Sequence, residues 1–416
     1  MWRVIYNIGV HFAFPFFALF ALTKKKIRRT FLQRLYVGKA PRMHDALWIH
    51  AASVGEAVIA ENLVNYLSER ATFSRFVITT NTDYTRDLLN KRLEERAYIS
   101  YLPFDLPLSI HHFMERSTFA GLIIIETELW PNLIWIAHAR GVPIIIVNGR
   151  ISDRTVKNYR SLSFFLRHLF PSIDLVLAQS REQAERFISI GMEPSRVIGV
   201  GNLKYYRFFD HPPDSGNRKE IITFGSIKEK ELPIILPVVT MLKKSFPDPP
   251  IYLVPRDLGL VSAIEEQLSA ELRICRFSER RESTATDADV VIVDTIGDLM
   301  TIYSRSLLAF VGGSLAPYGG QNILEPLFFA TPVLFGPYID NFKEIADTIL
   351  SSGAGRLVRD GNELFDAIRT LVENNEARES MGKAGLQVIK EQEAVMTKTV
   401  NIITEALWKN STALPR

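Results

Sequence analysis

The chain has 416 residues, of which 47% are hydrophobic and 23% charged, so it is long enough for two domains and its composition excludes a disordered protein. Its 49 lysines and arginines against 46 aspartates and glutamates leave a formal net charge of +3. This argues against a nucleic-acid binder, because such proteins usually have a dense basic patch. The single cysteine, Cys275, excludes an intrachain disulfide and a zinc site built from several thiolates.

The first predicted element is an apolar helix over residues 4–22, which is rich in phenylalanine and is followed by a basic block from Lys24 to Arg29. Such a helix rises about 28 Å, close to the thickness of the hydrocarbon core of a bilayer. Basic residues after the segment favour retention of the following chain in the cytoplasm. We therefore expect residues 1–30 to be a membrane anchor with a basic flank, whose partner is an anionic membrane surface.

Two other interpretations of this segment stay open. Pro15 and the polar residues Asn7 and His11 interrupt it, as in a helix that lies in the membrane interface and does not cross the bilayer. A cleaved signal peptide is less consistent with the sequence, because no small residues with cleavage-site spacing precede the basic block.

After the anchor, short apolar strands alternate with helical stretches, which is typical of an α/β protein with parallel sheets. The first series of predicted strands covers residues 46–51, 76–80, 97–102, 121–126, 143–148, 175–178 and 197–200. The second series covers residues 221–224, 251–254, 273–277, 290–293, 308–311 and 333–335.

A polar, proline-containing stretch over residues 211–217 separates the two series and is typical of a linker. We predict an N-terminal domain over residues 31–210 and a C-terminal domain over residues 211–416, each doubly wound, with ligands bound at the carboxyl ends of the strands in a cleft between the domains. The sequence also predicts a last helix from about residue 377 to 408 but does not place it.

The motif HAASVGE, residues 50–56, leads from a predicted strand into a predicted helix. Ser53 and Glu56 have the spacing of a capping box, which by itself indicates only the start of a helix. A carboxylate at the mouth of a cleft can also act as a general base, so Glu56 is a candidate catalytic residue.

Two further motifs of the first half follow strand ends. ETELWPN, residues 126–132, places Glu126 and Glu128 directly after an apolar strand, where they are either solvated turn residues or catalytic acids. GNLK, residues 201–204, ends in Lys204, which is either an ordinary exposed lysine or a cation that offsets developing negative charge.

The second half has motifs typical of a nucleotide site. Gly225 and Ser226 end a strand at a turn whose free backbone N–H groups suit a phosphate, and Arg256 in the motif VPR places a cation at the next strand end. Two glycine turns, residues 312–314 and 319–320, precede Asn322 and Glu325. Their N–H groups suit phosphate and the glutamate suits ribose hydroxyls, although a capped helix after a loop would have the same pattern.

In this order, the motifs between residues 48 and 355 resemble those of the 3-deoxy-D-manno-octulosonic acid (Kdo) transferase family of lipopolysaccharide biosynthesis. The resemblance rests on HAASVGE, ETELWPN, NGRISDRT, GNLK, GS-x4-E, VPR, FVGGSLAPYGGQNILEP and LFGPYIDNFKE. It implies a GT-B fold with two Rossmann-like domains facing across a cleft. It also implies an inverting transfer of Kdo from CMP-Kdo to the lipid A precursor lipid IVA, at the cytoplasmic face of the bacterial inner membrane and without a metal cofactor.

By this resemblance Glu56 is the catalytic base, and Glu126 and Lys204 stabilise the transition state. The residues carried over as the CMP site are Pro255, Arg256, Ile296, Gly297, Asp298, Asn322, Ile323, Leu324 and Glu325. Asp257, Gln321 and Lys228 stand where family members often have histidine. Gln321 can still form a hydrogen bond, whereas an aspartate at position 257 near a phosphate has no explanation in the sequence.

Asp287 and Asp289 form an acid-x-acid pair of the kind that binds a divalent metal in another glycosyltransferase fold, but they precede a predicted strand, so we expect a solvated turn. The histidines have no paired metal-ligand spacing. Two alternatives stay open: a GT-B enzyme with another nucleotide-sugar donor, whose phosphate and ribose contacts would be similar, and a two-lobed solute-binding protein, which would require export.

Overall fold

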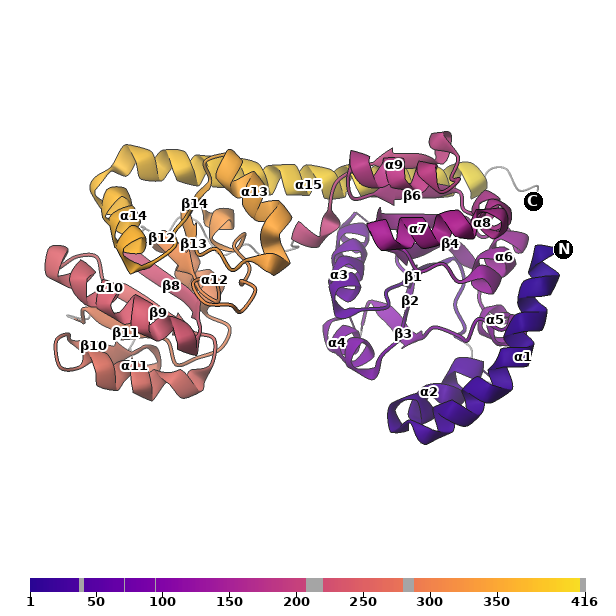
Figure 1. Ribbon diagram of the computed structural model, residues 1–416, viewed down its shortest axis with the longest axis horizontal. Coiled ribbons are helices and arrows are strands. Elements are labelled where there is room, and N and C mark those ends of the chain that lie inside the picture. Colours follow the sequence, from indigo (N-terminus) through magenta and orange to yellow (C-terminus); the bar gives the residue numbers. More distant parts are fainter. Residues whose placement is uncertain (37–40, 71, 94, 207–219, 280–287, 412–416) are drawn as a thin grey trace. The chain divides into compact units, whose positions relative to one another are not determined.

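The computed structural model describes residues 1–36, 41–70, 72–93, 95–206, 220–279 and 288–411 (Figure 1). The chain divides into two compact units: unit 1 comprises Met1–Phe208 with Gln392–Arg416, and unit 2 comprises Phe209–Glu391. Each unit is built on one seven-stranded sheet in which every strand pair is parallel. The structure thus confirms the predicted α/β class, and the predicted linker over residues 211–217 lies outside the described residues.

The sheet of unit 1 has the strand order β3-β2-β1-β4-β5-β6-β7. Its strands are β1 (Ala46–His50), β2 (Phe76–Thr80), β3 (Ala97–Tyr101), β4 (Phe119–Ile125), β5 (Ile144–Gly149), β6 (Leu175–Ala178) and β7 (Val197–Gly199). The chain builds outward from β1 in one direction and then, from β4, in the other. The carboxyl ends of β1 and β4 therefore flank the topological switch point, where doubly wound sheets bind ligands.

Alternating apolar side chains of these strands form a core on each face of the sheet. One core includes Trp48 and residues of α5, α6, α8 and α9, and the other includes Leu47 and residues of α3 and α4. The helices of this part of the chain are α1 (Trp2–Thr23), α2 (Lys25–Leu35), α3 (Val54–Glu69), α4 (Asp83–Leu93), α5 (Pro107–Met114), α6 (Pro131–Ala139), α7 (Asp153–Ser161), α8 (Ser163–Leu169) and α9 (Arg181–Ser189), with 3-10 turns η1 (Phe170–Ser172), η2 (Pro194–Arg196) and η3 (Leu203–Tyr205).

The sheet of unit 2 has the order β10-β11-β9-β8-β12-β13-β14. Its strands are β8 (Ile221–Ile227), β9 (Ile251–Pro255), β10 (Ile274–Arg276), β11 (Val290–Ile292), β12 (Ser306–Val311), β13 (Val333–Phe335) and β14 (Gly355–Leu357). The sequence predicts all of these except β14, which has only three residues and contains Arg356, so that no apolar run marks it.

Helices of unit 2 pack on its sheet, with the larger core between the strands and α10, α11 and α14. These helices are α10 (Leu232–Ser245), α11 (Val261–Leu268), α12 (Leu299–Ser304), α13 (Lys343–Ser351) and α14 (Gly361–Glu373), with 3-10 turns η4 (Glu229–Glu231), η5 (Leu258–Leu260), η6 (Phe277–Glu279), η7 (Pro326–Phe329) and η8 (Asp340–Phe342).

The last helix, α15 (Asn375–Ser411), contributes to both units. Near its start, Gly382 lies so close to the backbone of Ala330 that a Cβ would collide with it. Further along, the Thr397 hydroxyl is 2.6 Å from the Tyr66 hydroxyl, and Leu407 belongs to the core of unit 1. The sequence predicts this helix, and the structure shows which surface each part of it covers.

Candidate active site

The three candidate catalytic residues of unit 1 follow the ends of β1, β4 and β7, at the carboxyl edge of one sheet. Glu56 is in the first turn of α3, Glu126 follows β4 directly, and Lys204 is in η3. The charge of Glu56 and that of Lys204 both act on the carboxyl of Glu126. The structure therefore brings the three residues together, which their separation in sequence does not show.

Glu56 is nearly buried, with 6% of its surface exposed, and it lies in the first turn of the helix that Ser53 caps. Its backbone N–H donates to Ser53 Oγ at 3.3 Å, and its Oε2 accepts the Ala52 N–H at 2.7 Å. The structural interpretation of this motif is thus correct. It does not exclude a catalytic role, because the bond from the Ala52 N–H fixes the direction of the carboxylate.

Glu126 has a left-handed backbone with φ of 62°, an unusual conformation for a residue with a side chain. The pKa of the Glu126 carboxyl is raised mainly by burial and, to a smaller extent, by the negative charge of Glu56. The cations Arg150 and Lys204 act in the opposite direction. The pKa of Glu128 is also raised, mainly by burial and to a smaller extent by the charge of Glu56. Glu128 Oε2 accepts the Trp130 indole N–H at 2.9 Å. Strain and shifted acids at one place are typical of a functional site.

Two further residues lie at this edge, both in the motif NGRISDRT, and neither was predicted as a site residue from the sequence. Asn148 is buried at the end of β5 with φ of 58°, and its Oδ1 accepts the Leu203 N–H at 2.9 Å, which holds the turn that bears Lys204. Arg150 is the nearby cation that acts on Glu126. A polar residue at the end of a predicted strand is the signal that would have found both.

His50 is fully buried at the end of β1 and is a structural residue of the HAASVGE motif. Its Nδ1 is 3.0 Å from the Thr79 carbonyl oxygen, and burial lowers its pKa to about 4. The ring is therefore neutral at pH 7 and has no proton to donate to a substrate as an imidazolium.

In unit 2, Gly225, Ser226, Pro255 and Arg256 lie at the adjoining carboxyl ends of β8 and β9. A Cβ on Gly225 would collide with the Tyr303 hydroxyl, so only glycine fits at this position. The next residue, Ser226, has a left-handed backbone with φ of 55°. The Arg256 N–H donates to the Ile227 carbonyl at 2.9 Å, and its side chain is exposed. This arrangement leaves the guanidinium accessible to an anion at the strand ends.

The structure explains the departure at Asp257. Its Oδ1 accepts the Gly259 N–H at 2.9 Å, so the aspartate caps the 3-10 turn η5 that follows β9. A carboxylate at this position thus has a local structural role.

The sequence-based expectation for the first glycine turn is wrong. The N–H groups of Gly313, Ser314 and Leu315 do not face an open phosphate site, because they donate to the carboxylate of Glu231 at 2.7, 2.9 and 2.9 Å. Glu231 is fully buried and also accepts the Lys228 N–H at 2.9 Å. A protein carboxylate therefore satisfies the amides that were expected to bind the ligand.

At the second glycine turn, which leads toward the 3-10 turn η7, the Gly320 N–H donates to the Gly313 carbonyl at 2.8 Å. Asn322 Nδ2 donates to Glu325 Oε1 at 3.1 Å, and Asn322 Oδ1 accepts the Leu324 N–H at 3.2 Å. The side chains of Ile323 and Leu324 are buried, so only the backbone of these two candidates can face a nucleotide. Gln321 Nε2 donates to the Gly320 carbonyl at 3.1 Å.

The remaining candidates, Ile296, Gly297 and Asp298, follow β11 and precede α12. Gly297 has φ of 107°, which favours glycine, and the Ile296 side chain is 87% exposed. Asp298 Oδ2 accepts the Thr295 hydroxyl at 2.5 Å. The segment is a turn at the carboxyl edge with one apolar side chain directed to solvent.

Asp289, one half of the acid-x-acid pair, forms an ion pair with Arg273 at 3.2 Å, and hydrogen bonds from Arg273 help to hold its pKa below the usual range. It precedes β11 and thus lies at the amino edge of the sheet, as predicted, while Asp287 lies outside the described residues. In the described ranges, no group of three or more histidine, cysteine, aspartate or glutamate residues has the geometry of a metal site.

Comparison with solved structures defines the class of fold. The chain is similar to UDP-GlcNAc 2-epimerase from Neisseria meningitidis with a TM-score of 0.55 and 14% sequence identity, over 88% of this chain and 100% of that one. It is also similar to MurG from Acinetobacter baumannii, with a TM-score of 0.51 and 12% identity. The two parallel sheets thus have the GT-B fold, as the sequence resemblance implies.

Sequence comparison identifies the family. Residues 28–207 match the family model of 3-deoxy-D-manno-octulosonic-acid transferase (kdotransferase). The 3-deoxy-D-manno-octulosonic acid transferase of Haemophilus influenzae is 29% identical over 99% of this chain and 100% of its own length. A bifunctional glycosyltransferase/methyltransferase of Fusobacterium nucleatum is 32% identical over 88% of this chain, which spans 60% of that protein. The chain belongs to the Kdo transferase family, as its motifs predicted.

Proposed function

We propose that the chain transfers Kdo from CMP-Kdo to lipid IVA in an inverting single displacement. The observation that supports this most directly is the arrangement of Glu56, Glu126 and Lys204 at one sheet edge, where a fixed carboxylate, a second carboxyl of raised pKa and a cation interact. The transferase of Haemophilus influenzae, similar over the whole length, supports the assignment of Kdo as the transferred sugar.

In this mechanism Glu56 is the general base. It takes the proton of an acceptor hydroxyl, whose oxygen then attacks the anomeric carbon of Kdo while the bond to the CMP phosphate breaks. The Ala52 N–H holds Oε2, so the carboxylate presents Oε1 in a fixed direction. General base catalysis of this kind contributes about 10²–10⁴-fold to the rate.

Glu126, Lys204 and Arg150 act on the charge of the reacting groups. The Kdo donor is an anion with a sugar carboxylate and a phosphate, so the two cations that act on Glu126 favour its approach and stabilise the negative charge that develops on transfer. Glu126 stabilises the positive charge that builds up on the sugar ring as the phosphate leaves.

The CMP group belongs to unit 2 in this proposal. Arg256 stabilises the departing phosphate, aided by the turn of Gly225 and Ser226, and Glu325, held by Asn322, binds the ribose hydroxyls. Pro255, the backbone of Ile323 and Leu324, and the turn from Ile296 to Asp298 complete the nucleotide site. No metal cofactor takes part in the proposed reaction.

The membrane location completes the proposal. Trp2–Ala21 is an apolar stretch with mean hydropathy 1.7, and among the described residues it forms the one helix long and apolar enough to cross a bilayer. We place the enzyme at the cytoplasmic face of the bacterial inner membrane, with an anionic membrane surface as partner, because the lipid acceptor is embedded there.

Mass spectrometry of lipid IVA incubated with the full chain and freshly generated CMP-Kdo tests the function. The expected result is an added mass of one or more Kdo units. A UDP-sugar in place of CMP-Kdo is expected to give no product. Transfer from the UDP-sugar, with no transfer from CMP-Kdo, would show instead that the chain is a GT-B enzyme with another donor.

A further inference from the structure

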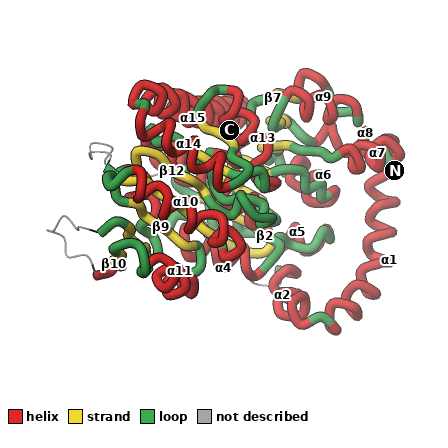
Figure 2. Tube along the Cα trace, turned by 60° about the vertical axis from the view of Figure 1, so that its left-hand side comes forward, coloured by secondary structure: helices red, strands yellow, loops and turns green. Residues whose placement is uncertain are grey.

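The helix α1 has two faces of different character. Partly or fully buried residues recur at positions 2, 6, 7, 10, 14, 18 and 21, a spacing that places them on one side of the helix. The opposite side exposes large apolar side chains: Val4, Ile5, Ile8, Phe12, Phe16, Leu19 and Phe20. Figure 2 shows α1 as a helix that leads from the N-terminus to α2.

Aromatic contacts attach the buried side of α1 to unit 1 at both of its ends. At the start, the Trp2 ring is 4.8 Å from that of Phe164 and the Tyr6 ring is 5.9 Å from that of Trp135. Toward the end, the Phe14 ring is 5.5 Å from that of Phe104. The helix therefore runs along unit 1 and not away from it (Figure 1).

Two polar contacts between these ends are specific. The Tyr6 hydroxyl donates to Asp105 Oδ2 at 2.7 Å, and Asn132 Nδ2 donates to Asn7 Oδ1 at 2.9 Å. Asp105 also accepts the N–H of Leu133 at 2.9 Å and so caps α6. Asn132 is the last residue of the ETELWPN motif, and the proposed reaction gives it no role. Its fully buried amide instead connects α1 to α6.

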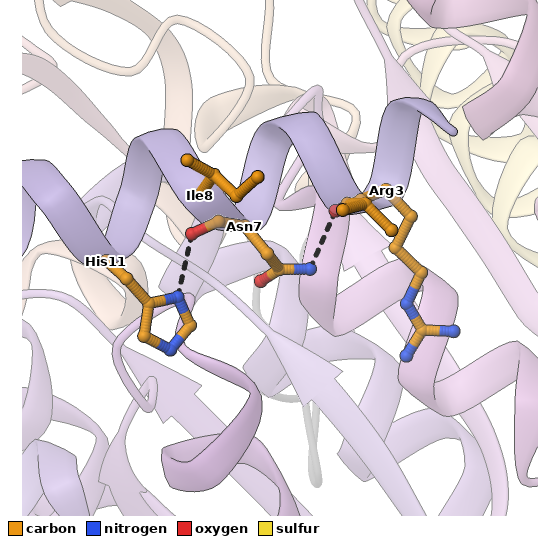
Figure 3. Close-up of a pocket in the computed structure, with 5 residues that line it drawn as sticks. Arg3, Asn7, Ile8 and His11 are labelled. Carbon is orange, nitrogen blue, oxygen red and sulfur yellow. Dashed lines mark hydrogen bonds between the residues drawn. The ribbon is translucent and has the colours of Figure 1, made fainter.

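Two polar side chains of α1 also bond to the backbone of the helix itself. Asn7 Nδ2 donates to the Arg3 carbonyl at 2.9 Å, and His11 Nδ1 is 2.7 Å from the Asn7 carbonyl oxygen (Figure 3). Asn7 and His11, the residues that interrupt the apolar sequence, thus have partners that do not require bulk water. The apolar side can enter a lipid layer without stripping these groups of hydrogen bonds.

The docked position is incompatible with a helix that crosses a bilayer. If α1 crossed the bilayer while docked, the residues that it contacts would enter the hydrocarbon with it, including Asp105 and the polar N-terminus of α6. If it crossed alone, it would lose all the contacts described above. An ionisable group at bilayer depth is costly. In-plane docking keeps all the contacts and still buries the exposed apolar side.

Charge complementarity identifies the partner. Exposed cations stand at both ends of α1, with Arg3 at the start and Lys24, Arg28 and Arg29 after its end. Leu32 on α2 and Leu108 on α5 add exposed apolar surface to the same unit, with 76% and 65% exposure. An apolar helical face flanked by cations is typical of a helix in the interface of an anionic bilayer.

We propose that α1 remains docked on unit 1 and lies in the surface layer of an anionic bilayer, with its outer face among the acyl chains, and does not cross the membrane. This rests on the proposed membrane location. It also gives the docking a consequence, since α6 begins at Pro131, directly after the segment that bears Glu126 and Glu128. The contact with Asn132 holds that acidic segment close to the surface where a lipid headgroup lies.

Spin-label depth measurement tests the proposal on the full chain. Single cysteines replace Val4, Ile8, Phe12, Phe16 and Leu19 in a Cys275→Ser background, and the labelled protein binds vesicles of phosphatidylethanolamine and phosphatidylglycerol. The expected result is a similar depth at all five positions, about 5–10 Å below the headgroups. A label at Val10, on the docked side, serves as the shallow control.

A crossing helix would move the labels along the bilayer normal by about 1.5 Å per residue, so that the depth would rise from position 4 to a maximum near position 12 and fall again toward position 19. Such a profile would overturn the proposal. Labels that show no contact with lipid at any position would overturn it too, and a dimer in sedimentation would then identify a second copy of the chain as the occupant.

A double variant tests the polar contacts, with Tyr6→Phe and Asn7→Leu removing both bonds while keeping the helix apolar. The expected result is loss of the uniform depth, whereas the matched control Ile5→Leu on the outer face keeps it. An unchanged profile in the double variant would show that these bonds do not hold α1. These readouts involve no sugar transfer, so the mass-spectrometric test of Kdo transfer can fail or succeed independently of them.

Discussion

The carboxyl edges of the two sheets have different chemistry. At the edge of unit 1, burial and the negative charge of Glu56 raise the pKa of Glu126 and of Glu128, and Glu126 has a strained backbone. At the edge of unit 2, the buried carboxylate of Glu231 accepts four backbone N–H groups. Unit 1 thus has acidic side chains whose surroundings disfavour the ionised form, which is typical of residues that take part in proton transfer. In unit 2 the buried acid instead holds loops in place.

This difference separates catalysis from binding within one chain. Substitutions at the edge of unit 1 should change the rate of transfer and leave the affinity for CMP intact. Substitutions at the edge of unit 2 should mainly change the affinity for CMP or the rigidity of the loops of that unit. Their effect on the chemical step of transfer should be smaller.

The largest effect is expected for Glu56→Gln. The glutamine retains an oxygen for the Ala52 N–H, so folding and CMP affinity should stay near wild type, while the transfer rate should fall by about 10²-fold or more because the base is lost. The rate of Kdo transfer measures the effect. Glu61→Gln, on the same helix, is the matched control, since its contact with Arg92 is at the surface. A Glu56→Gln enzyme with more than about a tenth of the wild-type rate would reduce Glu56 to a helix cap.

Glu231→Ala tests whether the buried acid of unit 2 holds its loops. The substitution leaves buried N–H donors without an acceptor, at a cost of at least about 2 kcal/mol. Hydrogen exchange of the amides of residues 313–315 should then be roughly 30-fold faster, since each 1.4 kcal/mol is a factor of ten. Glu229→Ala, at an exposed position of η4, should leave this exchange unchanged. Equal exchange in the two variants would contradict the proposed role of Glu231.

Arg256→Ala and Glu325→Ala should each weaken CMP binding by roughly 1–3 kcal/mol, because each removes a charge-assisted contact. Titration calorimetry gives the dissociation constants. Arg305→Ala is the matched control, because Arg305 precedes β12 and so lies at the opposite edge of the sheet. Wild-type CMP affinity in both variants would place the nucleotide elsewhere.

Glu126→Gln should stabilise the fold at neutral pH. Since burial and Glu56 raise the pKa of Glu126 in the folded state, the folded protein binds this proton more tightly than the unfolded chain does. Ionised Glu126 therefore costs stability above the raised pKa, and this cost disappears as the pH falls through it. The gain in the variant should be below about 1 kcal/mol because solvent screens a half-buried group. Thermal melts between pH 4 and about 7 measure it; a gain that persists at low pH would exclude this cause.

The smallest effect is expected from chelation. EDTA should leave the rate of Kdo transfer unchanged, because the proposed mechanism uses the cations Arg256 and Lys204 where other glycosyltransferases use a metal ion. Activity that is lost with EDTA and restored by magnesium would contradict this mechanism and would make Asp287 and Asp289 candidate metal ligands.

Local patterns predicted much of this molecule. Strand periodicity located six of the strands of unit 2 and missed β14, because a strand of three residues has no periodicity of its own. The helix start at Ser53 was predicted correctly because its cap, the bond from the Glu56 N–H to Ser53 Oγ, joins neighbours within one helical turn. The phosphate role of the first glycine turn was wrong because its acceptor, Glu231, is 82–84 residues away in the chain.

The sequence alone thus determined the α/β class, the order of the motifs and the family, since these depend on local periodicity and on residues at strand ends. Only the tertiary structure decided which charges interact, which amides were already satisfied and which side of α1 is outward. Hydrogen bonds such as those from Tyr6 to Asp105 and from Asn132 to Asn7 join residues about a hundred positions apart. Their energy depends on distance and burial in the folded chain, which no local pattern of residues encodes.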